Sequence, residues 1–318
     1  MQKRRLLGCS FPLAIALVVV FLALFIIGFL AGPIGKSMVG LNLPSWLSTT
    51  KPAPELPAET VFHIGGFPVA NSVLAGWITV IFLVVLVFLI TRRTRLVPRR
   101  WQMLLEFGLG ALLGFCQRVA GEKNGRRFFP VVGTIFLFVM FNAWLSLLPG
   151  FGSILITNAE GAEVHLLRGA NTDINTPLAL ALVSFVAVLG FGLRSLGIKY
   201  LANYFNFGEF ASGVGKLFKG NLKGAFSGMF TGFINIFIGL VELLSMFIRI
   251  VSFTFRLFGN MTAGEILLLM AAFLIPFVFA LPFYSLELLV GIIQALIFAG
   301  LTLVFMTLAV STHGSEHH

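Results

Sequence analysis

The chain has 318 residues, of which 58% are hydrophobic and only 11% are charged, and its formal net charge is +10. Soluble domains carry roughly 25% charged residues, so this composition excludes a protein that keeps most of its surface in water. The basic excess does not indicate a nucleic-acid partner, because the Lys and Arg residues form short clusters between apolar runs.

Long uncharged runs dominate the sequence, and each has close to the roughly 20 residues that cross a bilayer as a helix. None alternates with a period of two, which favours helices over the strands of a membrane barrel. In chain order the runs are Ser10–Gly35, Phe67–Thr91, Phe128–Ala159, Ile174–Leu193, Gly224–Val241, Ile266–Leu286 and Leu288–Thr312. The predicted fold class is all-α: a polytopic membrane protein with about six transmembrane helices, including a long tilted C-terminal helix pair.

The first run, Ser10–Gly35, precedes the main membrane region of the chain. It follows the basic residues Lys3–Arg5, as in a signal peptide, but no convincing small-residue cleavage site comes after it. Whether this hydrophobic anchor, residues 1–35, is retained or cleaved is therefore left open. We expect an outer loop at 36–70 and a membrane domain at 71–318, whose last two long helices lie at 224–270 and 284–312.

The distribution of basic residues predicts the topology. Basic clusters at Arg92–Arg100, Lys123–Arg127 and the Arg194–Lys223 loop alternate with loops that are nearly balanced or acidic. Cytoplasmic loops carry such an excess of Lys and Arg, so both termini are predicted to be cytoplasmic if the first span is retained. The polar segment Trp101–Arg127 is expected to lie on the cytoplasmic face as an amphipathic interfacial helix. Phe205–Gly228 is expected to be a cytoplasmic loop with partial helix.

A stripe of polar residues interrupts the apolar C-terminal region. On a helix its members fall within about 40° of Arg256 and climb about 27 Å, close to the thickness of the hydrocarbon core. They are Glu242, Ser245, Arg249, Ser252, Arg256 and Asn260. A charged stripe of this length is too costly to face lipid, because an arginine at the bilayer centre costs at least about 2.5 kcal/mol. It is expected to line an aqueous path or to meet carboxylates on another helix.

The two arginines of the stripe have different surroundings in the sequence. Arg249 has Glu242 two turns away, so an internal ion pair that locks the bundle is the alternative to a functional role. Arg256 has no acid on its own helix in a position to neutralise it, since Glu265 lies about 180° around the helix. We therefore expect Arg256 to be held for a partner that this chain does not supply.

Three more polar residues follow in apolar surroundings. Glu287 and Gln294 lie seven residues apart, on one face of the last run. If this helix packs antiparallel to the striped helix, with a turn near Pro276–Pro282, Glu287 approaches Glu265. Two buried carboxylates so close would share a proton. The alternative is that the two glutamates are solvated separately near the outer surface.

These residues carry a resemblance to a known family. The stretch "RLFGNMTAGE" around Arg256 closely resembles the signature of subunit a of F-type rotary ATP synthases. "VELLSMFIRIVSFTFRLFGNM", "GIIQALIFAGLTLVF", "GANTDINTPLALAL", "FNAWLSLLPG" and "PVANSVLAGW" resemble further motifs of that family in the same order. Apart from "PVANSVLAGW", which lies earlier in the chain, the resemblance covers roughly Phe128 to the C-terminus.

The resemblance implies an ion-translocating stator subunit with two aqueous half-channels, which couples proton or sodium flow to rotation and ATP synthesis. Arg256 would face the carboxylates of the rotor ring. The residues implied to line ion access are Asn260, Glu265, Glu287 and Gln294. Those implied to line the path toward the other side are Glu242, Ser245, Arg249 and Ser252. Candidates in the outer loop and at the channel entry are Asp173, Asn175 and Asn142. The partners implied are the rotor ring of proteolipid subunit c, the peripheral-stalk subunit b and the lipid bilayer, most simply that of a bacterial plasma membrane. The chain would not be catalytic alone, and no cofactor is implied.

The sequence departs from the family pattern at three points. Family members often have one acid and one histidine where this chain has Glu265 and Glu287. Asn142 stands seven residues before Pro149 rather than six, and Ser146 occupies a position that is acidic in some relatives.

Other classes of protein fit the residues less well. A secondary transporter or ion channel would also hold charges at mid-membrane, but no second half repeats the Arg256 region. A membrane enzyme would need a catalytic cluster or metal-ligand spacing, and a purely structural subunit would not need the stripe. The two cysteines, Cys9 and Cys116, indicate neither a disulfide framework nor a metal site.

Overall fold

The computed structural model describes residues 5–6, 9–39, 58–92, 100–148, 150–157, 161, 163–197 and 222–311. Several predicted features lie wholly or largely outside these ranges: most of the outer loop at 36–70, most of the basic cluster at Arg92–Arg100, the Phe205–Gly228 loop up to residue 221, and the C-terminal tail. The start of the N-terminal basic cluster also lies outside them.

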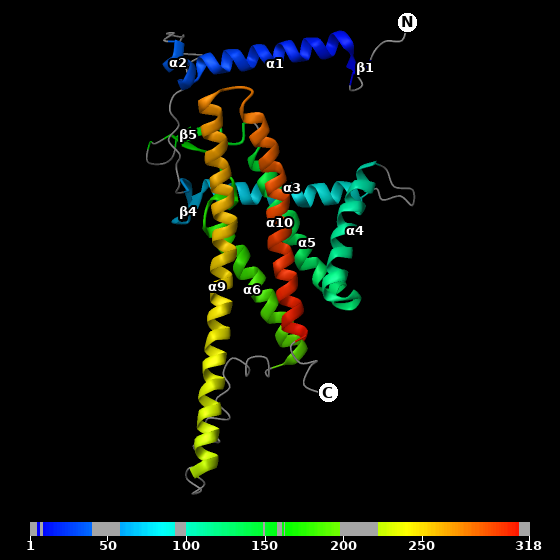
Figure 1. Cartoon of the computed structure of the whole chain (residues 1–318), viewed down its shortest axis with the longest axis vertical. Coiled ribbons are helices and arrows are strands. Elements are labelled where there is room, and N and C mark those ends of the chain that lie inside the picture. Colours follow the sequence, from blue (N-terminus) through cyan, green and yellow to red (C-terminus); the bar gives the residue numbers. More distant parts are fainter. Residues whose placement is uncertain are drawn as a thin grey trace. The chain divides into compact units, whose positions relative to one another are not determined.

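Helices make up most of the described chain (Figure 1). They are α1 (Phe11–Ala31), α2 (Pro33–Val39), α3 (Asn71–Thr91), α4 (Arg100–Ala120), α5 (Glu122–Ser146), η1 (Ala170–Thr172), α6 (Asn175–Leu196), α9 (Leu222–Leu274) and α10 (Ala280–Ser311). Within the described ranges, six of them (α3, α4, α5, α6, α9 and α10) are long and apolar enough to cross a membrane. The predicted all-α polytopic fold is confirmed.

The segment Trp101–Arg127 differs from its prediction. It is not one helix, because α4 ends at Ala120 and Gly121 adopts a φ of +79°, which favours glycine. The charged residues at 122–127 form the first turns of α5 instead. Without those charges α4 is apolar enough to span a membrane, so the prediction of a polar segment was wrong for α4. Its interfacial placement stays a prediction.

The strands form three short antiparallel hairpins in the segments that connect the helices. They are β1 (Arg5–Leu6) with β2 (Cys9–Ser10), β3 (Thr60–Ile64) with β4 (Phe67–Ala70), and β5 (Leu155–Thr157) with β6 (Glu163–His165). Gly65 and Gly66, both with positive φ, connect β3 to β4. Two positive φ values in a two-residue loop match the turn that the strand twist favours, so glycine suits both positions.

The described chain divides into two compact units, and four long helices contribute residues to both. The first unit consists of Met1–Ala75, Ala143–Thr172 and Gly259–Ile293. Its segments are joined by polar contacts: the Asn71 side-chain amide donates to the His165 carbonyl at 3.2 Å, and the His165 amide donates to the Glu59 carboxylate at 2.9 Å. The Trp144 indole donates to the Leu288 carbonyl at 3.1 Å.

The N-terminal helix α1 also belongs to the first unit, where it packs against the turn between α9 and α10. A Cβ atom added to Gly28 would collide with the Pro276 carbonyl oxygen, and one added to Gly32 with that of Leu274. Glycines four residues apart lie on one face of a helix and let another backbone approach closely. The other faces of α1 carry exposed Leu, Val, Ile and Phe side chains, as expected for a helix in contact with lipid.

The second unit consists of Gly76–Asn142, Asp173–Phe258 and Gln294–His318. Aromatic contacts join its helices: the rings of Phe128 and Phe191 lie 4.9 Å apart between α5 and α6, and those of Phe253 and Phe298 lie 4.9 Å apart between α9 and α10. A buried hydrogen bond from Asn142 to Thr79 (3.0 Å) holds α5 against α3. This unit therefore presents a fixed face of α9 beside α10.

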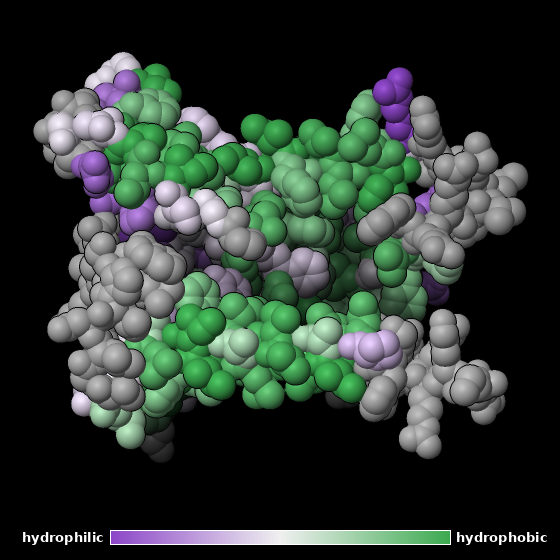
Figure 2. Space-filling view, turned by 90° about the horizontal axis from the view of Figure 1, so that it is seen from above, coloured by the Kyte–Doolittle hydropathy of each residue, from purple (hydrophilic) through white to green (hydrophobic). Residues whose placement is uncertain are grey.

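Apolar side chains cover most of the coloured surface in Figure 2. On α9 alone, Phe226, Phe230 and Phe237 are 77%, 60% and 58% exposed. Exposed large hydrophobic side chains of this density are not tolerated in water, so lipid or a protein partner covers them.

Candidate functional site

The predicted polar stripe lies on one continuous helix. All of its members fall within α9, which runs for 53 residues without an internal proline. Glu242, Ser245, Ser252 and Arg256 are exposed in the chain, whereas Arg249 and Asn260 are partly covered. Most of the stripe therefore faces away from the described part of this chain, where another molecule or water can reach it.

Arg256 is exposed, and its guanidinium makes no ion pair with any residue in the described ranges. Its backbone is nevertheless held firmly. The side-chain amide of Gln294, which is only 6% exposed, donates to the Arg256 carbonyl at 3.0 Å. α10 thus fixes the main chain at this residue and leaves the charged group available for an outside partner.

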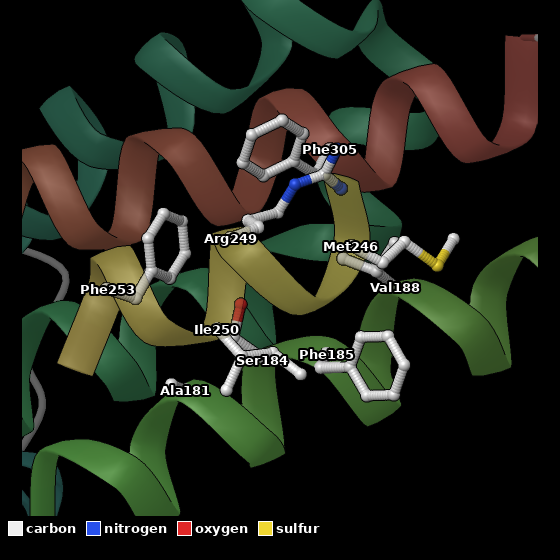
Figure 3. Close-up of a pocket in the computed structure, with 9 residues that line it drawn as sticks. All are labelled: Ala181, Ser184, Phe185, Val188, Met246, Arg249, Ile250, Phe253 and Phe305. Carbon is white, nitrogen blue, oxygen red and sulfur yellow. The ribbon is translucent and has the colours of Figure 1, made fainter. Parts of the chain in front are cut away.

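Arg249 lies two turns before Arg256 and is bound differently. Its guanidinium carbon lies 3.3 Å from the centre of the Phe305 ring on α10, a cation–π contact that is visible in Figure 3. The side chain is partly covered by this ring. The chain itself therefore supplies a partner for this second cation of the stripe.

Arg249 also lines a pocket between α6, α9 and α10 (Figure 3). Most of the lining is apolar, and Ser184 of α6 is its other polar side chain. The Ser184 hydroxyl lies 2.7 Å from that of Thr302, which donates its hydrogen to the Phe298 carbonyl at 2.9 Å. Ser184 is therefore the donor to Thr302, and this hydrogen bond joins α6 to α10.

The residues that contact one another show that α9 and α10 are antiparallel. In the second unit, Arg249 meets Phe305, Phe253 meets Phe298, and Arg256 meets Gln294. The first unit continues this order, with Gly264 against Glu287. α9 ends at Leu274 and α10 begins at Ala280, so the predicted antiparallel pair and its turn are confirmed.

Glu265 and Glu287 have different surroundings in the first unit. Glu287 is buried, and its carboxylate lies directly against Gly264, where it would collide with any side chain. Glu265 is paired instead with Arg168, 3.4 Å away, which lies just after β6. The sequence had not suggested this arginine; the signal was a lone basic residue directly before the GANTD motif. That the two acids share a proton stays a prediction.

The three outer-loop candidates form local hydrogen bonds. Asp173 is buried, and its carboxylate accepts from the backbone amide and the side-chain amide of Asn175, at 3.1 and 3.0 Å. This arrangement closes the turn that begins α6. Asn142 is buried against Thr79, as described above. These contacts explain why such polar residues occupy their positions, and a role in ion access stays a prediction for all three.

No three His, Cys, Asp or Glu side chains lie close enough together to hold a metal ion in the described ranges. Cys116 is a buried free thiol within α4.

Long apolar helices with charged side chains inside them define a multi-pass α-helical membrane protein. A model of the family described as "ATP synthase A chain" matches residues 73–307. The chain belongs to this family. It is 31% identical over 266 residues to ATP synthase subunit a of Gloeobacter violaceus, and the matched region covers 83% of this chain and 94% of the relative. It is 29% identical over 254 residues to ATP synthase subunit a of Moorella thermoacetica, with 80% and 96% covered.

Proposed function

We propose that this chain is the membrane stator subunit of a rotary ATP synthase, in which Arg256 faces the carboxylates of a rotor ring. One observation supports this most directly: Arg256 is an exposed cation inside an apolar helix and has no counter-charge in the described part of the chain. Such a charge in a membrane is expensive unless a partner or water meets it. A ring of carboxylates moving past supplies that partner.

Arg256 acts through its charge. A rotor carboxylate beside it is favoured in the ionised form, because an opposite charge within a few ångströms stabilises that form. The carboxylate must release its ion before it reaches Arg256 and take one up after passing. Arginine suits this role because its guanidinium stays charged and binds a carboxylate as a planar fork.

The ion reaches the ring by two half-channels on opposite sides of Arg256. Asn260, Glu265, Glu287 and Gln294 are the candidates on one side, and Glu242, Ser245, Arg249 and Ser252 are the candidates on the other. The fixed charge of Arg256 opposes a direct leak of cations between them. Each elementary charge that crosses 100 mV releases about 2.3 kcal/mol, and rotation collects this energy over several steps.

The other parts of the complex follow from this role. The partners are the ring of subunit c, the peripheral-stalk subunit b and the bilayer of an energy-transducing membrane, most simply a bacterial plasma membrane. Both termini then face the cytoplasm if α1 is retained. The ion is H⁺ or Na⁺, since the rotor carboxylates form the binding site. The chain has no catalytic role alone, because ATP is made elsewhere in the complex.

The decisive experiment replaces Arg256 in the whole complex. Arg256→Ala is expected to abolish ATP-driven ion pumping in membrane vesicles, while the complex still assembles. Arg126→Ala is the matched control, because this arginine is exposed and pairs with Glu122 at the start of α5. ATP-driven pumping that persists in Arg256→Ala would refute the proposed function.

A further inference from the structure

We propose that Arg168 is a positioning residue that supplies the counter-charge for Glu265 on the ion path. The inference rests on the proposed function, since Glu265 matters to transport only if it lies on that path. The contact that carries it is the ion pair between Arg168 and Glu265, with 3.4 Å between nitrogen and oxygen. The Arg168 side chain is 10% exposed and that of Glu265 is 37% exposed.

The backbone around Arg168 is held in place. The next residue, Gly169, packs against Ser146, whose Cβ would lie 3.1 Å from a Cβ at this position. The Gly169 carbonyl accepts hydrogen bonds from the backbone amide and the hydroxyl of Thr172, at 3.0 and 2.7 Å. On the other side, the amide of Leu166 donates to the Ile154 carbonyl at 2.8 Å. Arg168 therefore extends from a fixed turn.

The near-complete burial of Arg168 makes its charge significant. A buried cation is tolerated when a carboxylate meets it, and removing one partner leaves the other buried and uncompensated. Glu265, on α9, is the acid that meets Arg168. The turn between β6 and α6 thus supplies the charge that compensates Glu265 on α9.

The pair gives the two acids different roles. The charge of Glu265 is compensated by Arg168, whereas Glu287 makes no ion pair in the described residues and is buried against Gly264. Glu265 therefore has a fixed counter-charge on the path, and Glu287 is the acid without an ion-pair partner among the described residues.

A charge series at position 168 tests the inference in the intact complex. Arg168→Lys, Arg168→Gln and Arg168→Glu are compared for ATP-driven pumping in vesicles, with the amount of assembled complex measured for each. Lysine is expected to keep most of the rate, and glutamine to lower it roughly tenfold, as the loss of one charge-assisted hydrogen bond would. Glutamate is expected to lower the rate further. The same series at Arg126, whose pair with Glu122 is exposed, is expected to change the rate little.

The outcomes separate this inference from the proposed function. Rates that do not follow the charge at position 168, with lysine no better than glutamine, would overturn the role of Arg168. If Arg168→Gln prevents assembly, the pair Arg168→Gln with Glu265→Gln is expected to restore it, because neither position is then left with an uncompensated charge. Failure of that rescue also overturns the inference. Arg256→Ala reports on the proposed function alone, whichever way the Arg168 series falls.

Discussion

Two arginines, seven residues apart on α9, have opposite environments. Arg249 lies against the Phe305 ring, whereas Arg256 is exposed and unpaired in the described part of the chain. α10 touches both residues, but it binds the side chain of the first and the backbone carbonyl of the second. The same helix face thus holds one cation against a ring of the chain itself and leaves another exposed.

The difference shows that a position on the stripe does not define a role. Both arginines belong to the same polar face by helical spacing, so the periodicity of the sequence treats them alike. The neighbouring helix distinguishes them, because it places an aromatic ring beside one and an amide beside the other. The largest experimental differences should therefore appear when the two arginines are changed in the same way.

Lysine substitutions should give the largest difference in pumping between the two positions. Arg256→Lys keeps the charge but loses the planar fork, so coupled pumping is expected to fall at least roughly tenfold. Arg249→Lys is expected to keep most of the pumping, since a lysine ammonium still interacts with the Phe305 ring. Pumping by vesicles that contain equal amounts of complex measures both. Equal losses at the two positions would show that the two arginines do not differ in their role in pumping.

Gln294 should give an intermediate effect. Gln294→Leu removes the hydrogen bond to the Arg256 carbonyl, a contribution of about 1 kcal/mol, so a loss of pumping of about fivefold is expected. Thr307→Val is the control on α10, because the Thr307 hydroxyl donates within its own helix, to the Leu303 carbonyl. A full rate in Gln294→Leu would mean that the position of Arg256 does not depend on this amide.

Loss of the Phe305 contact should have the smallest effect, and that effect should be on stability rather than on transport. A double-mutant cycle of Arg249→Met and Phe305→Leu is expected to give a coupling free energy of about 1 kcal/mol. Thermal denaturation of the purified complex in detergent measures it, with pumping largely kept in the Phe305→Leu variant. A coupling near zero would show that the two side chains do not stabilise each other.

The sequence predicted the long elements and the stripe well. Hydrophobic runs and helical spacing depend on residues near each other in the chain, so they indicated a long helix at 224–270 with a polar face, a turn near Pro276–Pro282 and a last helix at 284–312, close to the bounds of α9 and α10. The tilt of this helix pair and the ion-path roles of the stripe residues stay predictions.

The missed features depend on residues far apart in the chain or on local backbone geometry. The pair of Arg168 and Glu265 joins positions 97 residues apart, and Phe305 reaches Arg249 from another helix. Nothing in the spacing of either residue indicates such a neighbour. The break at Gly121 was missed because charges from the start of α5 were assigned to the preceding segment.

The close packing of Gly28 and Gly32 on the turn after α9 constrains the order of biosynthesis. The backbone that α1 touches is made roughly 240 residues after it, about 10 to 50 s at typical rates of translation. Until then the backbone against which these glycines pack has not been made. Membrane insertion must therefore keep the opening helix accessible until the closing hairpin arrives.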